Sequence, residues 1–399
     1  MVPSDGPDSP DPEPGPEPRP QPGPDPRRLG EVARVFLKLG ALGFGGPAAH
    51  IAMMRLEVVE RRAWVGEQEF LDALGVTGVI PGPGSTQMAI YLARRRAGWP
   101  GLVVGGTCFV LPAMAIVLAL AWAYVEYGTT TIGRGLLYGI TPVVIGIVAD
   151  AVVRLGRSAI RTVRLALLAG LVVVGWFTGA PVLLLLLGAG AVEAAAAHLG
   201  KWRDRGAAAA AFLAASAGGR RAHVHGVSLV DVFLEFLKLG AVVFGSGYVL
   251  VAYLQHDLVD HLHWITQQQL VDAVAAGQVT PGPVFTTATF VGYLVAGFWG
   301  GVVATIAIFL PSFLLVAAFG WIVPHLRRWT WSAAALDGVN AAAVALMAGV
   351  TWDLGGTAIV DVLTALLALA SFAVLWRWRP NLVWLVLAGA LVGVVHAVV

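Results

Sequence analysis

The sequence lacks the residue groupings that enzymes and metal proteins require. Its single cysteine, Cys108, lies in an apolar run, which excludes a disulfide framework and a cysteine-based zinc site. It contains no phosphate-binding loop, Walker lysine or nucleophile–histidine–acid set, so neither catalysis nor ATP hydrolysis is indicated and no cofactor is expected. His256, His261 and His263 lie together, but the other half of the chain has no matching set, and we expect no metal there.

Charged residues are scarce as well. They make up 13% of the chain, against about 25% in soluble domains, and a net charge of +2 gives no reason to expect nucleic acid as a partner. Apolar residues form long runs without the two-residue alternation of membrane barrels. A run of about 20 residues crosses the bilayer, and must do so as a helix because lipid cannot hydrogen-bond backbone groups. The sequence therefore predicts an all-α polytopic protein of a bacterial-type plasma (inner) membrane.

Residues 1–28 differ from the rest of the chain. Eleven of the 23 prolines lie there, mixed with Asp, Glu and Gly, and such a composition cannot bury a core. The segment has no apolar stretch and no basic start, so it is not a signal peptide. We expect a disordered tail without a role in transport.

The remainder contains an internal repeat, which the spacing of identical motifs reveals. The sequence FLKLGA occurs at residues 36–41 and again at 236–241, and Pro-Gly-Pro occurs at 81–83 and at 281–283. Trp64 and Trp264 also match at the same separation of 200 positions. This predicts a first repeat over 29–199, a cytoplasmic linker over 200–228 and a second repeat over 229–399.

Basic residues mark cytoplasmic loops, and they alternate in opposite senses in the two repeats. The cluster Arg94 to Arg96 has an uncharged partner near residue 296, whereas the neutral or acidic loop at 126–127 corresponds to Arg327 and Arg328. The pattern predicts two repeats of inverted topology, as in many secondary transporters. We expect about ten crossings, with 31–52, 101–125, 132–152, 163–178 and 181–199 in the first repeat. Residues 66–97 and 266–297 are expected to be two hairpins broken at Pro-Gly-Pro.

The two Pro-Gly-Pro turns are the main candidate site. Proline prevents a continuous helix and suits the first turn of a new one, so a half-helix is expected to begin near Pro83 and near Pro283. Helix N-termini bind anions through free N–H groups and the helix dipole. Hydroxyl and amide side chains follow in both copies and can donate to an oxyanion. The alternative is a proline kink with capping hydroxyls.

Three further pairs of positions are candidates. Lys38 and Lys238 lie in apolar stretches, where a charge is costly, and could attract an anion or extend to the membrane interface; Glu235 could neutralise Lys238. The glycine-rich breaks at 43–46 and 245–247 allow unwinding or only close helix packing. Asp72 and Asp272 could bind a proton or a coupling ion, although we favour the polar face of an amphipathic helix as their explanation, because both neighbourhoods hold other polar residues.

The motifs FLKLGALGFGGP and IPGPGSTQMA, with FLKLGAVVFGSGY and VTPGPVFTTATFVGY in the second repeat, resemble the chromate ion transporter family in its long, two-domain form. The resemblance covers about residues 30–399 and implies two homologous antiparallel domains that export chromate. It departs in the second copy, where Ser246 replaces Gly46 and Val284-Phe285 replaces Gly84-Ser85. The motifs and the residues beside them give these candidate substrate-binding positions: Lys38, Gly45, Gly46, Pro81, Gly82, Pro83, Gly84, Ser85, Thr86, Gln87, Lys238, Gly245, Ser246, Pro281, Gly282, Pro283, Thr286 and Thr287.

The resulting hypothesis places chromate between the two half-helix tips near the bilayer midplane. Sulfate or another oxyanion is an alternative cargo, because sulfate has the same shape and charge as chromate. A membrane scaffold or intramembrane enzyme is an alternative of another class. Direction, coupling ion and oligomeric state do not follow from the sequence.

Overall fold

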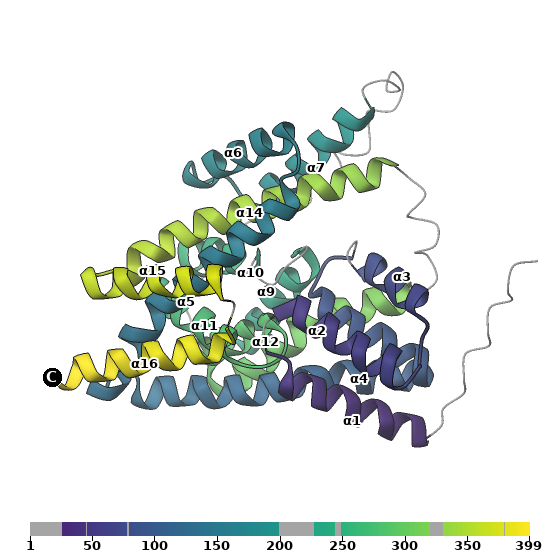
Figure 1. Ribbon diagram of the computed structural model, residues 1–399, viewed down its shortest axis with the longest axis horizontal. Helices are drawn as coiled ribbons and strands as arrows, with labels where there is room; N and C mark the ends of the chain where they lie inside the picture. The colour runs from purple at the N-terminus through teal and green to yellow at the C-terminus, as the bar shows by residue number, and fades with distance from the viewer. Residues whose placement is uncertain are drawn as a thin grey trace, which may run out of the picture.

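The computed structural model describes residues 26–44, 46–77, 80–198, 227–243, 249–319, 330–378 and 380–399. Over these ranges the chain is helical and contains no β-strand (Figure 1), which confirms the predicted helical class. Gly45, Gly245, Ser246, the expected tail up to residue 25 and most of the expected linker lie outside the described residues.

In the described residues the two repeats have the same order of elements, apart from one short 3-10 turn in the second. The first contains α1 (Pro26–Leu42), α2 (Gly46–Met54), the π-helix η1 (Arg55–Arg61), α3 (Glu67–Thr77), α4 (Gly84–Tyr127), α5 (Thr131–Ala159), α6 (Val163–Phe177) and α7 (Val182–His198). The second contains α9 (Leu229–Val242), α10 (Val249–Tyr253), the π-helix η3 (Leu254–His261), α11 (Gln267–Val279), the short 3-10 turn η4 (Val284–Thr286), α12 (Thr287–Phe319), α14 (Thr330–Ala358), α15 (Val362–Arg377) and α16 (Leu382–Val398).

The observed helices refine two expected boundaries, one of them at the glycine-rich break expected over 43–46. Helix α1 begins at Pro26, so the last three residues of the expected tail are helical; proline is favoured at a helix start because its φ is already helical. The expected crossing over 31–52 is interrupted, since α1 ends at Leu42 and α2 begins at Gly46, whose φ of 78° no regular helix contains.

Helices α4 and α12 each reverse direction near one end. In α4 the backbone leaves the helical conformation at Ala97 and Gly98. Side chains added at Gly101 and Gly105 would collide with Ala93, so the segments on either side of the break lie against each other. In α12 the break falls at the matching Ala296 and Gly297. Residues 84–96 therefore return alongside the long segment that follows them, and this break separates the expected hairpin 66–97 from the expected crossing 101–125.

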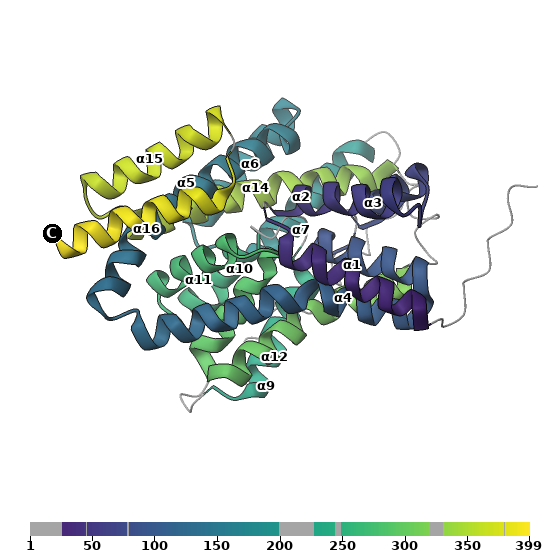
Figure 2. The same ribbon diagram turned by 60° about the horizontal axis from the view of Figure 1, so that its bottom comes forward.

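The last two helices of each repeat pack on the other repeat. Helices α6 and α7 lie against α14, whereas α15 and α16 lie against α5 (Figures 1 and 2). Glycine makes these contacts close, because a side chain at Gly139 would collide with the carbonyl of Gly389, and one at Gly338 with that of Ala189. Small residues at such contacts are typical of helix association in lipid. The last two helices of each repeat therefore pack mainly on a long helix of the other repeat.

Four of the described helical segments are long and apolar enough to cross a membrane: Gly84–Tyr127, Thr131–Ala159, Val284–Ala318 and Ala334–Ala358. Helices α6, α7, α15 and α16 are apolar but shorter; at 1.5 Å per residue, α6 with its 15 residues is about 23 Å long. Large apolar side chains such as Leu167 and Leu171 point outward from it. These apolar side chains therefore lie on the outside of the helix, as expected for a helix that faces lipid.

Candidate substrate-binding site

Each Pro-Gly-Pro turn is hydrogen-bonded to the end of the first helix of the opposite repeat. The N–H of Gly82 donates to the carbonyl of Val243, which ends α9, at 2.6 Å. The N–H of Gly282 donates to the carbonyl of Gly43, just after α1, at 2.9 Å. Gly82 and Gly282 have φ values of 118° and 91°, which glycine adopts readily and other residues do not. The same bond thus forms in both directions between the repeats.

The tips of the two turns enclose a small hollow. It is lined by Pro47, Pro83, Gly84, Ser85, Pro283, Val284 and Phe285. About 10 Å³ is open to the centre of a water-sized sphere, which is room for one water molecule. A tetrahedral oxyanion needs more space than this, so the structure brings the tips together in a closed arrangement.

The tip of the first repeat presents hydrogen-bond donors. The first N–H groups of α4, beginning at Gly84, have no carbonyl partner inside the helix, and Pro83 provides no side-chain cap. Ser85 is almost fully buried at the hollow, and the buried hydroxyl of Thr86 has no partner. Gln87 donates through Nε2 to the carbonyl of Pro81 at 2.5 Å. Gln87 therefore holds the turn in shape through one of its two amide hydrogens.

The tip of the second repeat differs. The hydroxyl of Thr286 donates to the carbonyl of Pro283 at 2.9 Å, and that of Thr287 donates to the carbonyl of Val284 at 2.9 Å. Both expected side-chain donors are thus occupied by their own backbone. Val284 and Phe285 contribute an apolar wall instead. The two half-sites are therefore chemically unequal.

Two polar residues beside the tips were missed by the sequence reasoning. His50 is buried, and its Nε2 lies 2.8 Å from the carbonyl of Gly43, the acceptor of the Gly282 bond. Because a carbonyl can only accept, Nε2 carries the proton. The buried hydroxyl of Ser312 has no partner and lies where a side chain at Gly82 would project. A polar residue beside a proline in an apolar run was the available signal for Ser312.

Neither candidate lysine lines the hollow. Lys38 pairs with Glu57 of η1 at 3.6 Å, and Lys238 pairs with Asp257 of η3 at 2.9 Å and with Glu235 at 2.5 Å. The partners Glu57 and Asp257 are themselves separated by 200 positions, so the ion pair belongs to the repeat. The contact with Glu235 confirms the expected local neutralisation of Lys238.

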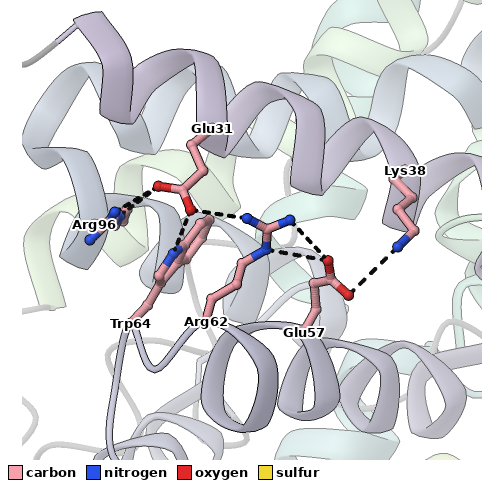
Figure 3. A network of polar contacts seen from close by, with 6 residues as sticks. All are labelled: Glu31, Lys38, Glu57, Arg62, Trp64 and Arg96. Atoms are coloured by element: carbon pink, nitrogen blue, oxygen red, sulfur yellow. Dashed lines mark hydrogen bonds and ion pairs between the residues drawn. The ribbon is translucent and has the colours of Figure 1, made fainter.

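In the first repeat this pair is part of a larger ionic network (Figure 3). Glu57 also accepts from Arg61 and Arg62, and Arg62 connects it to Glu31. Glu31 in turn accepts from Arg96 at 2.6 Å and from the indole of Trp64 at 3.2 Å. The network joins α1, η1 and the turn of α4, and holds the first half-helix to the start of the repeat.

The environment of Glu57 keeps it ionised. Burial alone raises its pKa, but the hydrogen bond from Arg62, the charge of Lys38 and the hydrogen bond from Arg61 outweigh burial, and the pKa lies below its ordinary value. Glu57 is therefore the negative centre that holds Lys38.

The two candidate aspartates have different surroundings. Asp72 is exposed on α3, beside Gln68 at 3.2 Å. Asp272 is 3% exposed and accepts from Tyr124 at 2.9 Å, Gln268 at 3.1 Å and Thr141 at 3.3 Å. Asp272 thus joins α11 to α4 and α5, whereas Asp72 lies on the exposed side of its helix. Over the described ranges, no group of three or more His, Cys, Asp or Glu residues is placed to bind a metal ion.

Long apolar helices, outward apolar side chains and two repeats that exchange helices define a multi-pass helical membrane protein. Comparison with known proteins gives its family. A family model described as "Chromate transporter" matches residues 30–194 and again 230–394, so the chain belongs to the chromate transporter family and its two repeats are confirmed.

Curated relatives agree over almost the whole chain. The chain is 36% identical over 375 residues to the "Chromate transport protein" of Cupriavidus metallidurans, covering 92% of this chain and 93% of the relative. It is 36% identical to the "Probable chromate transport protein" of Synechococcus elongatus, covering 89% and 91%. It is 32% identical to the "Chromate transport protein" of Pseudomonas aeruginosa, covering 90% of each. No solved structure matches this chain.

Proposed function

We propose that this protein is a secondary transporter of the bacterial-type inner membrane that exports chromate from the cytoplasm by alternating access, and so gives chromate resistance. The observation that supports it most is the reciprocal bonding of the two Pro-Gly-Pro tips across the repeat boundary. A broken helix pair that meets between two repeats is the usual position of a transporter's substrate site. The names of the relatives supply the cargo.

The proposed topology has inverted repeats with about ten crossings and two re-entrant hairpins. In support, Arg95 at the turn of α4 pairs with Glu69 near the start of α3, so the base of the first hairpin lies beside basic residues. At the end of α5, Arg157 lies over the ring of Trp376 near the end of α15, 4.3 Å from its centroid. At the start of α5, Tyr138 contacts Asp361. The end of this helix group at Arg157 and Arg377 is thus basic, and an excess of Lys and Arg is what the positive-inside rule associates with the cytoplasmic side.

In the proposed bound state chromate occupies an enlarged form of the hollow. The N–H groups at Gly84 and Ser85 and the hydroxyls of Ser85 and Thr86 donate to its oxygens, and Ser312 lies close enough to add a further hydroxyl. Pro81, Gly82 and Gln87 shape the first tip, while Pro281, Gly282 and Pro283 shape the second. Thr286 and Thr287 maintain the second tip by capping their own backbone.

Enlarging the hollow requires the tips to separate, which is why we propose alternating access. Separation breaks the bonds of Gly82 and Gly282 to the opposite repeat and moves α1 and α9, which carry Lys38 and Lys238. The lysines then exchange a carboxylate partner for the incoming anion. Gly46, at the start of α2, provides the backbone freedom for that movement through its positive φ.

The driving force for export is available from the membrane potential. Moving one charge is worth about 2.3 kcal/mol per 100 mV, so a dianion leaving a negative interior gains about 4.6 kcal/mol. At about 1.36 kcal/mol per decade this sustains, at 100 mV, a gradient of more than three decades, roughly 2,500-fold. If a proton is coupled in addition, Asp272 is the residue that we propose for it, because it is buried at a junction of three helices.

The decisive experiment is flux of labelled chromate and labelled sulfate in proteoliposomes, with potential and pH gradients imposed separately. We expect potential-driven chromate movement toward the positive side. If sulfate outcompetes chromate, the proposed substrate changes to sulfate, but the protein is still a transporter. Absence of flux of either ion would remove the transporter proposal and leave a scaffold.

A further inference from the structure

The two reciprocal bonds between the repeats are not equivalent, because a histidine side chain supports one of the two acceptors. The carbonyl of Gly43 accepts the backbone N–H of Gly282 at 2.9 Å and also the ring N–H of His50, through Nε2, at 2.8 Å. A carbonyl oxygen has two lone pairs and accepts both bonds. If the Gly282 bond breaks, the Gly43 carbonyl therefore still has a hydrogen-bond donor.

The matching acceptor in the second repeat, the carbonyl of Val243, lacks this support. It accepts the N–H of Gly82 at 2.6 Å. The residue 200 positions after His50 is Leu250, whose side chain has no hydrogen to donate. Val243 is fully buried, and a buried carbonyl that loses its donor carries the full cost of its desolvation. The Gly82 bond is therefore the costlier of the two to break.

Packing alone does not require a histidine at position 50. Leu250 fills the matching position fully buried, whereas His50 is 2% exposed and its Nδ1 has no partner, which is a cost that leucine avoids. The neighbouring residue differs as well. A side chain at Gly43 would meet the His50 ring, 2.7 Å from Cδ2 and 2.9 Å from Nε2, while the matching Val243 carries a side chain. What the histidine adds is thus its bond to the Gly43 carbonyl.

The N–H that this arrangement can release lies in the half-site that has few donors. In the second tip the hydroxyls of Thr286 and Thr287 donate to their own backbone. The N–H of Gly282 belongs to the same tip. His50 lies three residues after Pro47 on α2, and residues at this spacing share a helix face. Pro47 lines the hollow, so the histidine lies one helical turn away from it.

We propose that His50 is a positioning residue for anion binding: it keeps the Gly43 carbonyl hydrogen-bonded, so that the N–H of Gly282 leaves that carbonyl first and donates to the oxyanion. The bond of Gly82 to Val243 breaks later, because Leu250 cannot replace the lost donor. His50 does not contact the anion and acts through Gly43. The inference rests on the proposed function, which supplies the anion, and adds a backbone donor to the second half-site.

The order of bond breaking is tested by the reactivity of a single cysteine in the hollow. Cys108→Ala removes the one native cysteine, and Val284→Cys then places a thiol on the wall of the hollow. A small methanethiosulfonate reagent needs more room than one water molecule, so it reaches this thiol when the tips separate. The full-length reporter protein is labelled in proteoliposomes without added anion, and chromate flux is measured on the same preparations.

His50→Leu puts the second-repeat residue into the first repeat of the reporter protein. We expect labelling and chromate flux each to slow at least about fivefold, because the Gly43 carbonyl then loses its last donor as the tips separate. His50→Gln keeps an amide N–H for that carbonyl and is expected to label at nearly the rate of the reporter. The matched control is Leu250→Met, a volume-conserving change that is expected to leave the labelling rate unchanged.

A purely structural role for His50 predicts the opposite sign, since looser packing gives a lower Tm and faster labelling. The proposal is overturned by a His50→Leu protein that labels as fast as the reporter or faster, or by a His50→Gln protein that is as slow as His50→Leu. Wild-type protein that moves neither chromate nor sulfate removes the proposed function. Normal flux together with unchanged labelling in His50→Leu removes this inference alone.

Discussion

The N–H of Gly82 in the first repeat donates to the carbonyl of Val243 in the second, at 2.6 Å. The bond ties the Pro-Gly-Pro tip of one repeat to the helix end of the other, and its counterpart from Gly282 makes the arrangement reciprocal. Any movement that opens the hollow must break at least one of these bonds. The geometry of the tips is therefore the first property to test.

Gly82→Ala should destabilise the protein. Its φ of 118° is unfavourable for alanine, and the new methyl group would lie 2.5 Å from the hydroxyl of Ser312 and 2.7 Å from Nε2 of Gln87. Such backbone strain costs about 1–3 kcal/mol, which thermal unfolding in detergent would detect as a lower Tm. Gly188→Ala in α7 is the control, because an added methyl group meets nothing within 4 Å there. Equal Tm values for the two variants would contradict the tip geometry.

Ser85→Ala should weaken chromate binding. A hydrogen bond to a charged group contributes about 1.5–3 kcal/mol, so the apparent affinity in proteoliposome flux should fall at least tenfold. Thr286→Ala should have a smaller effect, because that hydroxyl already donates to Pro283. Ser158→Ala, at the exposed end of α5, is the control. If Ser85→Ala behaves as Ser158→Ala does, chromate is not held by the first tip.

Glu57→Gln should remove a pH-dependent part of the stability. The folded pKa of Glu57 lies below its ordinary value of 4.5, so its contribution is present above about pH 4.5 and is lost as pH falls through the folded value. The substitution should lower the free energy of unfolding by about 1–3 kcal/mol at neutral pH and flatten the acid limb of Tm against pH. Glu60→Gln, whose side chain is 47% exposed, should change both far less. An acid limb of unchanged slope in Glu57→Gln would refute this assignment.

Asp272→Asn should separate proton coupling from potential-driven flux. The amide oxygen can still accept one of the two bonds that Tyr124 and Thr141 donate to the separate carboxylate oxygens, but the amide cannot take up a proton. We expect chromate flux that responds to potential and no longer to an imposed pH gradient. Asp72→Asn, on the exposed side of α3, should respond as the wild type does. A pH response that survives in Asp272→Asn would exclude Asp272 as the coupling residue.

The local features of the fold followed from the sequence because they depend on local chemistry. The Pro-Gly-Pro breaks and the repeat were visible as motifs, and the turn at Gly98 coincides with the boundary expected between residues 97 and 101. The packing of the last two helices of each repeat on the other repeat was not predictable. The apolar pattern of α6 does not specify whether that helix packs on α5 or on α14. The different burial of Asp72 and Asp272 was also hidden, since both follow a glutamine by four positions.

The position of the first tip in the candidate site followed from the same local chemistry. Pro83, Gly84 and Ser85 reach the hollow because a proline starts the helix there. Lys38 was placed with the anion on charge alone, whereas its distance of 3.6 Å from Glu57 places it in an ion pair with η1. Sequence spacing gives no distance between residues of different helices, so the choice between these partners required coordinates.

The exchange of helices has a consequence for biosynthesis. Residues 199–329 separate the end of α7 from the start of α14, so α7 leaves the ribosome 131 residues before the helix on which it packs. At about 5–20 residues per second this is a wait of roughly 7–26 s, during which α6 and α7 have only lipid and their own repeat as neighbours. A truncated product ending in the linker would carry an unsatisfied helix surface, and should be recognised by membrane quality control rather than persist as a half-sized protein.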